Sequence, residues 1–407
     1  MTQLPPPDAG VPALLTLLSD DAVSVFAAAE DSLGFEVKEL TLAQVRYLPG
    51  RSIVAQYRSK IVDRDGSEAS PMLVAASGIK VPDGPVQLAD EHGTVIAMWR
   101  FPADPHLPGL AAATNKDRAA DLLERLGAPS DGVRLRVRAY RATRRAVVEA
   151  AGSSGTVFMK VLRPSRVAAL QERHTLLAPH LPIPHSLGWS QRLGIVAMQA
   201  MPGQTLRRSL EAAHPNQPAP AALAALLDAM PPLSSDAKQV RAAHMRFDDH
   251  SRLLGTVMPE AAGILETLRQ YVPAAESSEQ STTVHGDFHS SQVLVNQGEI
   301  VGLVDVDTVG RGERSTDYAN LIGQLATVAM ISDNPAPIEE YIGLLLEDFD
   351  NRVDPPVLRT KVAFVIAGLA TGPFRVQAFE WPEDTLQRLE LAVKWATAAE
   401  KDSSSNP

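Results

Sequence analysis

The spacing of apolar side chains divides the chain into a β-rich first part and a helical second part. Residues 12–34 carry apolar side chains at helical spacing and predict a helix that ends near Gly34. Between residues 37 and 98, alternating apolar and polar positions separated by turn sequences such as DRDGSE predict β-strands. Residues 115–127 predict a short helix that ends at a glycine, and we place a domain boundary after this helix.

A second β-rich segment follows this boundary. Strands are predicted at 133–140, 145–150 and 156–162, then a helix at 166–177 and a strand at 195–198. The remainder is predicted to be mostly helical, with short strands within it at 292–295 and 300–306. The predicted helices are 206–213, 219–230, 235–272, 316–331, 337–348, 356–371 and 384–399. This order predicts an α+β fold with two lobes and a cleft between them.

The two β-rich segments share a weak sequence repeat. Tyr47, Arg51 and Val54 recur at a constant offset as Tyr140, Arg144 and Val147. Three matches are compatible both with an internal duplication and with chance.

Composition narrows the class of protein. The 407 residues are 45% hydrophobic and 21% charged, which is typical of a globular protein. The net charge of −10 argues against a nucleic-acid partner, and no apolar stretch is long enough to predict a membrane partner. The absence of cysteine excludes disulfides and thiolate chemistry, and without a targeting segment we expect a cytoplasmic protein.

The stretch from Thr283 to Asn320 concentrates the side chains that can carry chemistry. Alternation along a strand would place the carboxylates of Asp305 and Asp307 on one side, at the end of an apolar run. Bare carboxylates there are costly unless they are paired or bound to a cation, and a nearby amide such as that of Gln292 suits Mg²⁺. His285, Asp287 and His289 also fit a transition-metal site, whereas His285 alone fits a structural histidine.

The sequence HGDFHSSQ, from His285 to Gln292, followed by Asp305, resembles the catalytic and metal-binding loops of the aminoglycoside phosphotransferase family, whose pattern is H-x-D-x-x-x-x-N. Glutamine in place of the asparagine is similar to the maltokinase-like branch. The resemblance covers about residues 130–400, and Asp317 falls where the family has an aspartate that braces the catalytic loop.

The resemblance implies a role for each residue of these loops. Asp287 would act as the base on the acceptor hydroxyl, and Gln292 and Asp305 would bind the Mg²⁺ that accompanies ATP. Asp307 would assist at a second metal, and His285 and Asp317 would be structural.

The resemblance also implies a nucleotide site in the β-rich lobe. Lys160 would bind the phosphates of ATP with Glu172 as its partner, although a strand lysine can be an edge residue and Glu172 a solvated one. The segment that contains Gln199 and Met201 resembles the family's hinge between the lobes, where backbone groups would bind adenine.

The acceptor side is less defined. Glu380 and Trp381 suit a sugar or amino-sugar, but Trp381 equally fits a hydrophobic anchor at a helix end. The acidic balance of the chain slightly favours a neutral or cationic acceptor over an anionic one.

We therefore expect a protein-kinase-like two-lobed fold with an extra N-terminal α/β cap. The expected division is a cap at 1–128, an ATP-binding N-lobe at 129–202, a helical C-lobe at 203–400 and a disordered tail at 401–407. The expected enzyme is a small-molecule kinase that moves the γ-phosphate of ATP to a hydroxyl of a sugar, an amino-sugar or an aminoglycoside. Two alternatives stay open: a non-catalytic pseudokinase that binds a nucleotide or another ligand, and a metal-dependent hydrolase that uses His285, Asp287 and His289.

Overall fold

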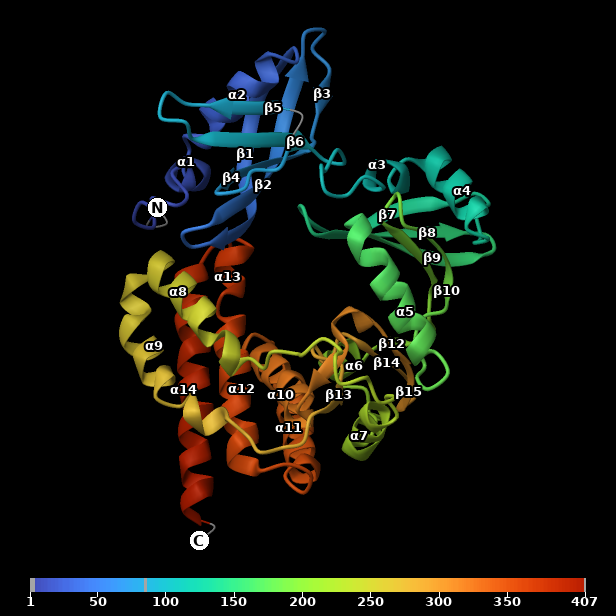
Figure 1. Cartoon of the computed structure of the whole chain (residues 1–407), viewed down its shortest axis with the longest axis vertical. Coiled ribbons are helices and arrows are strands. Elements are labelled where there is room, and N and C mark those ends of the chain that lie inside the picture. The colour runs from blue at the N-terminus through green and yellow to red at the C-terminus, as the bar shows by residue number, and fades with distance from the viewer. Residues whose placement is uncertain (1–3, 84–85, 406–407) are drawn as a thin grey trace.

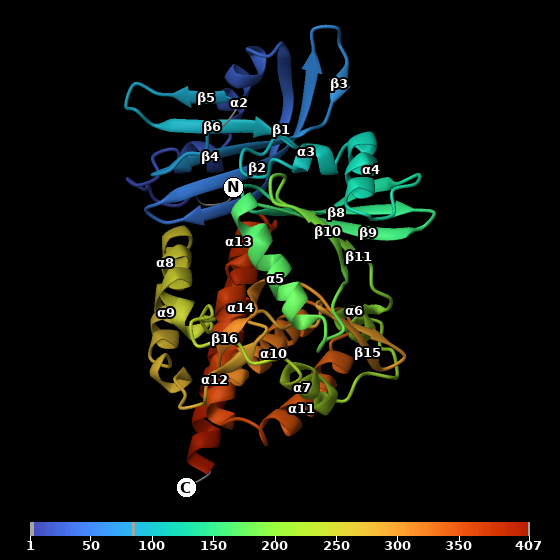
Figure 2. The same cartoon turned by 45° about the vertical axis from the view of Figure 1, so that its right-hand side comes forward.

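The protein has two β-sheets and a helical lobe, seen in a computed structural model that describes residues 4–83 and 86–405. Figure 1 shows the first sheet at the top, the second sheet at the right and the helices below. Figure 2 shows the first sheet above both the second sheet and the end of the helical lobe that carries α13 (Gly372–Arg375).

The N-terminal sheet is antiparallel, with the strand order β1-β2-β4-β6-β5 and β3 paired to β2. Its strands are β1 (Phe35–Leu48), β2 (Ser52–Asp63), β3 (Glu68–Ala69), β4 (Met72–Gly78), β5 (Val86–Ala89) and β6 (Val95–Arg100). Two helices, α1 (Leu14–Leu18) and α2 (Ala22–Asp31), precede it. Phe26 of α2 packs edge-on against Tyr57 of β2, and the Tyr57 hydroxyl donates to the Leu17 carbonyl at 2.5 Å. These contacts fix both helices against the sheet.

The second sheet has the strand order β10-β11-β9-β8-β7. Its strands are β7 (Arg134–Arg141), β8 (Arg145–Gly152), β9 (Gly155–Leu162), β10 (Ser186–Ser190) and β11 (Ile195–Gln199). The helix α5 (Val167–Leu177) connects β9 to β10. Two short helices, α3 (Leu110–Ala113) and α4 (Lys116–Arg125), pack their apolar side chains against this sheet. The boundary predicted at residue 128 lies between α4 and β7.

The helical lobe contains most of the remaining chain. Its helices are α6 (Leu206–Glu211), α7 (Pro220–Asp228), α8 (Phe247–Val257), α9 (Ala262–Arg269), α10 (Arg314–Met330), α11 (Ala336–Phe349), α12 (Pro355–Leu369), α13 and α14 (Trp381–Ser405). Five short strands accompany them: β12 (Gln204–Thr205), β13 (Thr282–Val284), β14 (Val293–Asn296), β15 (Glu299–Leu303) and β16 (Gly310–Gly312). In the described part of the chain, one helical segment, Pro355–Arg375, is long and apolar enough to cross a membrane by length and composition. In this segment, 67% of the apolar 18-residue window is buried inside the protein, as in the core helix of a helical lobe.

The first sheet contacts both other parts of the molecule. One hydrophobic cluster runs from the N-terminal sheet into the helical lobe, where α13 packs against β1. A second cluster joins Trp99 of β6 to Ala142, in the turn between β7 and β8. The carboxylate of Asp104 accepts the Tyr140 hydroxyl at 2.8 Å and the Thr143 backbone N–H at 2.7 Å. The N-terminal cap therefore holds the end of the β7–β8 hairpin.

Four predicted segments differ from the structure. The helix predicted at 12–34 is divided into α1 and α2, and the helix predicted at 235–272 begins only at His244. Residues before His244 run alongside β16 instead, with the Val240 N–H donating to the Arg311 carbonyl at 2.7 Å. The strand predicted at 300–306 ends at Leu303. The tail predicted to be disordered, 401–407, continues α14 to Ser405, and residues 406 and 407 lie outside the described residues.

Candidate active site

Lys160 lies at the centre of the second sheet and connects the two lobes. It belongs to β9, which pairs with β8 on one side and β11 on the other, so it is not an edge lysine. Its ammonium group donates to Asp305 Oδ1 at 2.7 Å and to Asp307 Oδ1 at 2.5 Å. Only 7% of the Lys160 side chain is exposed. A buried ammonium needs such partners, because an unpaired charge in this position would be strongly destabilising.

Arg145 adds a second cation to the same pair of carboxylates. Its guanidinium lies 3.3 Å from Asp305 Oδ2 and 3.6 Å from Asp307 Oδ2. Arg145 is the first residue of β8, directly after the turn that the cap holds. Arg145 was not predicted from the sequence, because arginine is frequent along these strands and no motif marks this position.

Asp305 and Asp307 reach these cations from a turn rather than from the predicted strand. β15 ends at Leu303, and Asp305 has left-handed backbone angles, φ 61° and ψ 46°, before the single 3₁₀ turn Val306–Thr308. This conformation is uncommon outside glycine and is frequently found at functional sites. Burial alone would raise the pKa of Asp305, but Lys160 and Arg145 outweigh burial and lower the pKa to about 2.

The loop after β13 carries Asp287. Burial raises the pKa of Asp287, and the nearby Asp305 also raises it, while His289, Arg145 and Arg246 act in the opposite direction. A base with a raised pKa holds a proton better than an ordinary aspartate does.

Asp317 braces this loop. From the first turn of α10, its carboxylate accepts the backbone N–H groups of His285 at 2.7 Å and Gly286 at 2.8 Å. Complete burial raises the pKa of Asp317 to about 6, although these two hydrogen bonds act against that rise. Gly286 has φ 80°, and a Cβ there would lie 2.9 Å from the Thr308 carbonyl oxygen, so the loop requires glycine at this position. The contact predicted between Asp317 and the loop is present.

Gln292 provides a test of the expected magnesium site. Its Nε2 donates to Asp287 Oδ2 at 3.4 Å, while its Oε1 is buried without a partner. An orphaned amide oxygen, in a residue that contacts the loop carboxylate Asp287, is an oxygen donor of the kind that Mg²⁺ accepts as a ligand. In the described chain, no group of three or more His, Cys, Asp or Glu residues could hold a metal without other donors. The residues present therefore fit a cation that also takes ligands from phosphate oxygens, as Mg²⁺ does at nucleotide sites.

His285 occupies a structural position. Its side chain is completely buried, its Nε2 lies 3.3 Å from the Val304 carbonyl oxygen, and burial lowers its pKa to about 4. His289 is also more neutral than usual, because burial lowers its pKa despite the neighbouring Asp287. These positions do not join the two histidines and Asp287 into the metal cluster of the hydrolase alternative.

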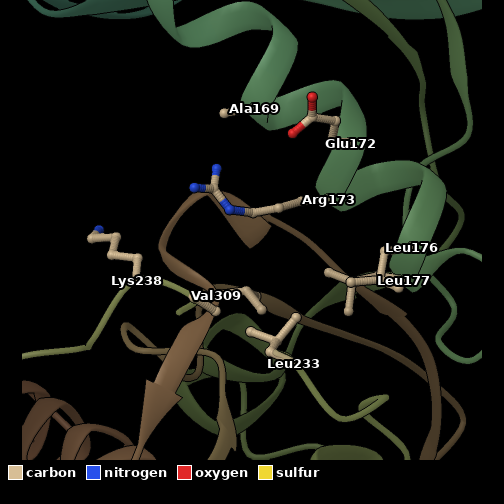
Figure 3. A pocket seen from close by; sticks show the side chains of 9 residues that line it. Ala169, Glu172, Arg173, Leu176, Leu177, Leu233, Lys238 and Val309 are labelled. Atoms are coloured by element: carbon tan, nitrogen blue, oxygen red, sulfur yellow. The ribbon is translucent and has the colours of Figure 1, made fainter. Parts of the chain in front are cut away.

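Glu172 is not the partner of Lys160 in this structure. It is exposed on α5 and lines a separate cavity of about 220 Å³ with Arg173 and Lys238, as Figure 3 shows. His174 of α5 does influence the site: it is buried, and its pKa is lowered by burial and then by Lys160. The correction follows from helix rotation, because Glu172 and His174 lie on different faces of α5.

Gln199 and Met201 lie where β11 leaves the second sheet. The backbone N–H of Gln199 donates to the His185 carbonyl at 2.9 Å, so this group is already paired within the protein. The thioether of Met201 lies over Gly302, where an added Cβ would come within 3.1 Å of its sulfur. The adenine contact of the Met201 backbone stays a prediction.

The expected acceptor role of Trp381 is wrong. Trp381 is 4% exposed and packs edge-on against Phe374, with 5.1 Å between ring centroids. It is the hydrophobic anchor at the start of α14, the alternative that its position also allowed, and it cannot stack on a ligand. Glu380 beside it is exposed.

The chain belongs to the phosphotransferase enzyme family, because the model of that family, "APH: Phosphotransferase enzyme family", matches residues 136–354. The predictions of a two-lobed α+β fold and of a small-molecule phosphotransferase are thereby confirmed. No curated protein is similar enough in sequence to match.

Several solved structures are similar to this chain. One is a thermostable mutant of the aminoglycoside phosphotransferase APH(4)-Ia in a ternary complex with ADP and hygromycin B, with 18% identity, a TM-score of 0.48, and coverage of 68% of this chain and 97% of that one. Another is the macrolide 2'-phosphotransferase MphH from Brachybacterium faecium, with 19% identity, a TM-score of 0.41, and coverage of 67% and 98%. A third is an aminoglycoside-3'-phosphotransferase of type VIII, with 20% identity, a TM-score of 0.42, and coverage of 62% and 99%.

Proposed function

We propose that this phosphotransferase moves the γ-phosphate of ATP to a hydroxyl group of a sugar-like small molecule. One observation carries the proposal: Lys160 from the β-rich lobe meets Asp305 and Asp307 from the helical lobe at 2.7 and 2.5 Å, beside the loop of Asp287. A cation and carboxylates brought together across two lobes are the elements that phosphoryl transfer needs.

In this proposal the residues act as follows. Asp287 accepts the proton of the acceptor hydroxyl as that oxygen forms its bond to the γ-phosphorus and ADP leaves. Lys160 and Arg145 lie where they can turn from the carboxylates to the phosphates of ATP. Gln292 and Asp305 would hold Mg²⁺, with Asp307 at a second ion. When bound, the metal offsets the negative charge of the transferring group.

The acceptor is proposed to be a sugar or amino-sugar, with maltose-like saccharides before aminoglycosides. The preference rests on charge, because Arg246 and Arg145 both act on Asp287 and would repel a polycation. Arg246 is partly buried and interacts electrostatically with Asp287. The glutamine at position 292 supports placing the chain in the maltokinase-like branch.

Thermal unfolding with ATP, with Mg²⁺ and with both tests the nucleotide site, since a ligand of the folded state must raise its stability. We expect the full increase only with both together. A panel of sugars and aminoglycosides should then reveal the acceptor by ADP release. If millimolar Mg·ATP does not change the melting temperature, the proposal is wrong.

A further inference from the structure

A cavity of about 80 Å³ lies where the cap, the second sheet and the helical lobe meet. Its walls come from β1 and β2, from the turn between β7 and β8, and from α13. Figure 1 shows this turn pointing into the region between the first sheet and α13. The cavity has room for a small polar group, since a single water needs about 10–15 Å³ by the same measure.

The walls of this cavity are strongly basic. Four arginines line it, namely Arg46, Arg141, Arg144 and Arg375, and no aspartate or glutamate does. Among residues 4–83 and 86–405, no ion pair within 4 Å joins any of the four to a carboxylate, and Arg46 donates to the Thr143 hydroxyl at 3.0 Å. The chain has 48 acidic and only 38 basic residues, so the lack of carboxylate partners here does not reflect a shortage of acidic side chains.

The arginines repel one another in this position. Burial, Arg144 and Arg163 together lower the pKa of Arg46 to about 10, while Asp104 acts in the opposite direction. Burial also lowers the pKa of Arg141, with Arg145, Arg375 and Arg144 contributing. Asp104 and Asp305 partly offset this repulsion at Arg46 and Arg141, and a bound anion would add a negative charge inside the cavity itself.

A buried amide also faces the cavity. Gln56 is 4% exposed, its Nε2 donates to Gln44 Oε1 at 2.5 Å, and its own Oε1 is buried without a partner.

The cavity adjoins the phosphoryl-transfer site. Arg141 pairs across the hairpin with Arg145, whose guanidinium reaches Asp305 and Asp307. Asp104 fixes the turn between them by accepting the Thr143 N–H at 2.7 Å. An anion bound to Arg141 in this cavity would therefore be connected to the proposed metal-binding carboxylates through the neighbouring Arg145.

We propose that this cavity binds the phosphate or carboxylate group of a small molecule through Arg46, Arg141, Arg144 and Arg375. The inference rests on the proposed function in one respect, because the source of the anion is inferred from the neighbouring phosphoryl-transfer site. The anionic group belongs either to the acceptor molecule or to a separate anionic effector. It reverses the expectation from net charge, because the local charge at the cavity is positive while that of the whole chain is negative.

The first test is binding of inorganic phosphate by calorimetry at low ionic strength, in the presence of a saturating non-hydrolysable ATP analogue and Mg²⁺. The analogue fills the nucleotide site, so that phosphate reports on the cavity. Arg375→Gln and, separately, Arg46→Gln should each raise the Kd for phosphate about tenfold to a hundredfold, the effect of one charged hydrogen bond. Arg58→Gln, at an exposed arginine of β2 that does not line the cavity, should leave it unchanged.

Two outcomes of this test would overturn the inference. One is a wild-type protein that does not bind phosphate, and the other is equal phosphate affinity in the wild type, Arg375→Gln and Arg46→Gln. Failure of the proposed function is seen separately, because the ATP analogue itself would then not bind while phosphate still would.

The second test identifies the source of the anion. ADP release is measured with matched acceptors, glucose against glucose 6-phosphate and glucuronate. An anionic acceptor whose KM rises about tenfold in Arg375→Gln with kcat unchanged assigns the cavity to the acceptor. Phosphate that binds and alters turnover of a neutral acceptor, with no use of the anionic ones, assigns it to an effector. Both results support the cavity as an anion site.

Discussion

Asp287 is the residue on which the proposed chemistry depends most directly. Asp287→Asn keeps the size of the side chain but cannot accept the proton of the acceptor hydroxyl. We expect turnover to fall about a hundredfold to ten-thousandfold, with the Kd for Mg·ATP nearly unchanged. Single-turnover ADP release and nucleotide titration measure the two effects. Asp249→Asn, on the exposed surface of α8, is the control, and a variant at 287 as active as this control would refute the base assignment.

The ion pair of Lys160 gives a pH-dependent prediction. The pKa of Asp305 is lowered from its ordinary 3.8 to about 2 in the folded protein, so its contribution to stability is present above pH 4 and is lost as the pH falls toward 2. This contribution is about 2 kcal/mol. Lys160→Met removes the strongest of the charges that lower this pKa.

We therefore expect Lys160→Met to be less stable than the wild type at pH 7, with the difference narrowing as the pH falls from about 4 to about 2. Urea unfolding at a series of pH values measures this difference. Lys80→Met, at an exposed lysine of the cap, should show no such trend. A difference that is independent of pH would argue against the pair.

Single residues were predictable where a motif fixes their spacing. Asp287, Gln292, Asp305 and Asp317 gather around one loop, as their spacing indicated, because the short hairpin between them leaves little freedom. Glu172 and Trp381 illustrate the opposite case, because which face of a helix is covered depends on packing against distant segments and no local pattern encodes it.

At the scale of elements, the repeat in the sequence corresponds to a repeat in topology. Without the two-residue β3, each sheet has five strands, and numbering them along the chain gives the same spatial order in both: first, second, third, fifth, fourth. This order is β1-β2-β4-β6-β5 in the first sheet and β7-β8-β9-β11-β10 in the second. Tyr47 and Tyr140 lie near the ends of the first strands, and Arg51 and Arg144 lie in the turns that follow. The shared topology favours duplication over chance. α5 connects the third and fourth strands of the second sheet, whereas residues 79–83, the described residues directly after β4, contain no helix.

Strand ends were less predictable than strands. The apolar alternation continues through Val304 and Val306, but the chain leaves the ladder at Leu303 so that Asp305 can turn toward Lys160. The ion pair with Lys160 is a contact between distant segments of the chain, and the alternation of apolar and polar residues within one strand cannot predict it. The same holds before His244, where pairing with β16 replaces the predicted helix.

The join between α12 and α10 leads to a prediction at this scale. Lys361 of α12 is 1% exposed, and its ammonium donates to Ser315 Oγ at 2.6 Å and to Glu313 at the start of α10, the helix that carries Asp317. Lys361→Ala leaves a cavity and an unpaired carboxylate, so we expect a loss of about 3–5 kcal/mol in unfolding free energy. Lys361→Met should cost less because it restores the packing.

Urea unfolding measures both variants against Lys394→Ala, at an exposed lysine of α14. Equal stability of Lys361→Ala and Lys394→Ala would show that the buried amine does not join the two helices.

At the scale of the whole molecule, the cap controls the loop that faces the transfer site. Asp104 is 4% exposed and accepts both the Thr143 N–H and the Tyr140 hydroxyl, while Trp99 donates to the same hydroxyl at 3.2 Å. Thr143 has φ 63°, a conformation that needs such support in a β-branched residue. The cap thus determines where Arg144 and Arg145 lie.

Asp104→Asn removes the charge from these hydrogen bonds and should lower the unfolding free energy by about 2 kcal/mol. The local effect distinguishes a positioning role from a merely stabilising one: the Thr143 amide should exchange with solvent faster in the variant, relative to amides in the centre of β9, and the KM for Mg·ATP should rise. Asp131→Asn, an exposed aspartate before β7, is the control for both measurements. If Asp104→Asn is destabilised but keeps the wild-type Thr143 exchange and the wild-type KM, the cap does not position the loop, because the turn then holds its conformation without the buried carboxylate.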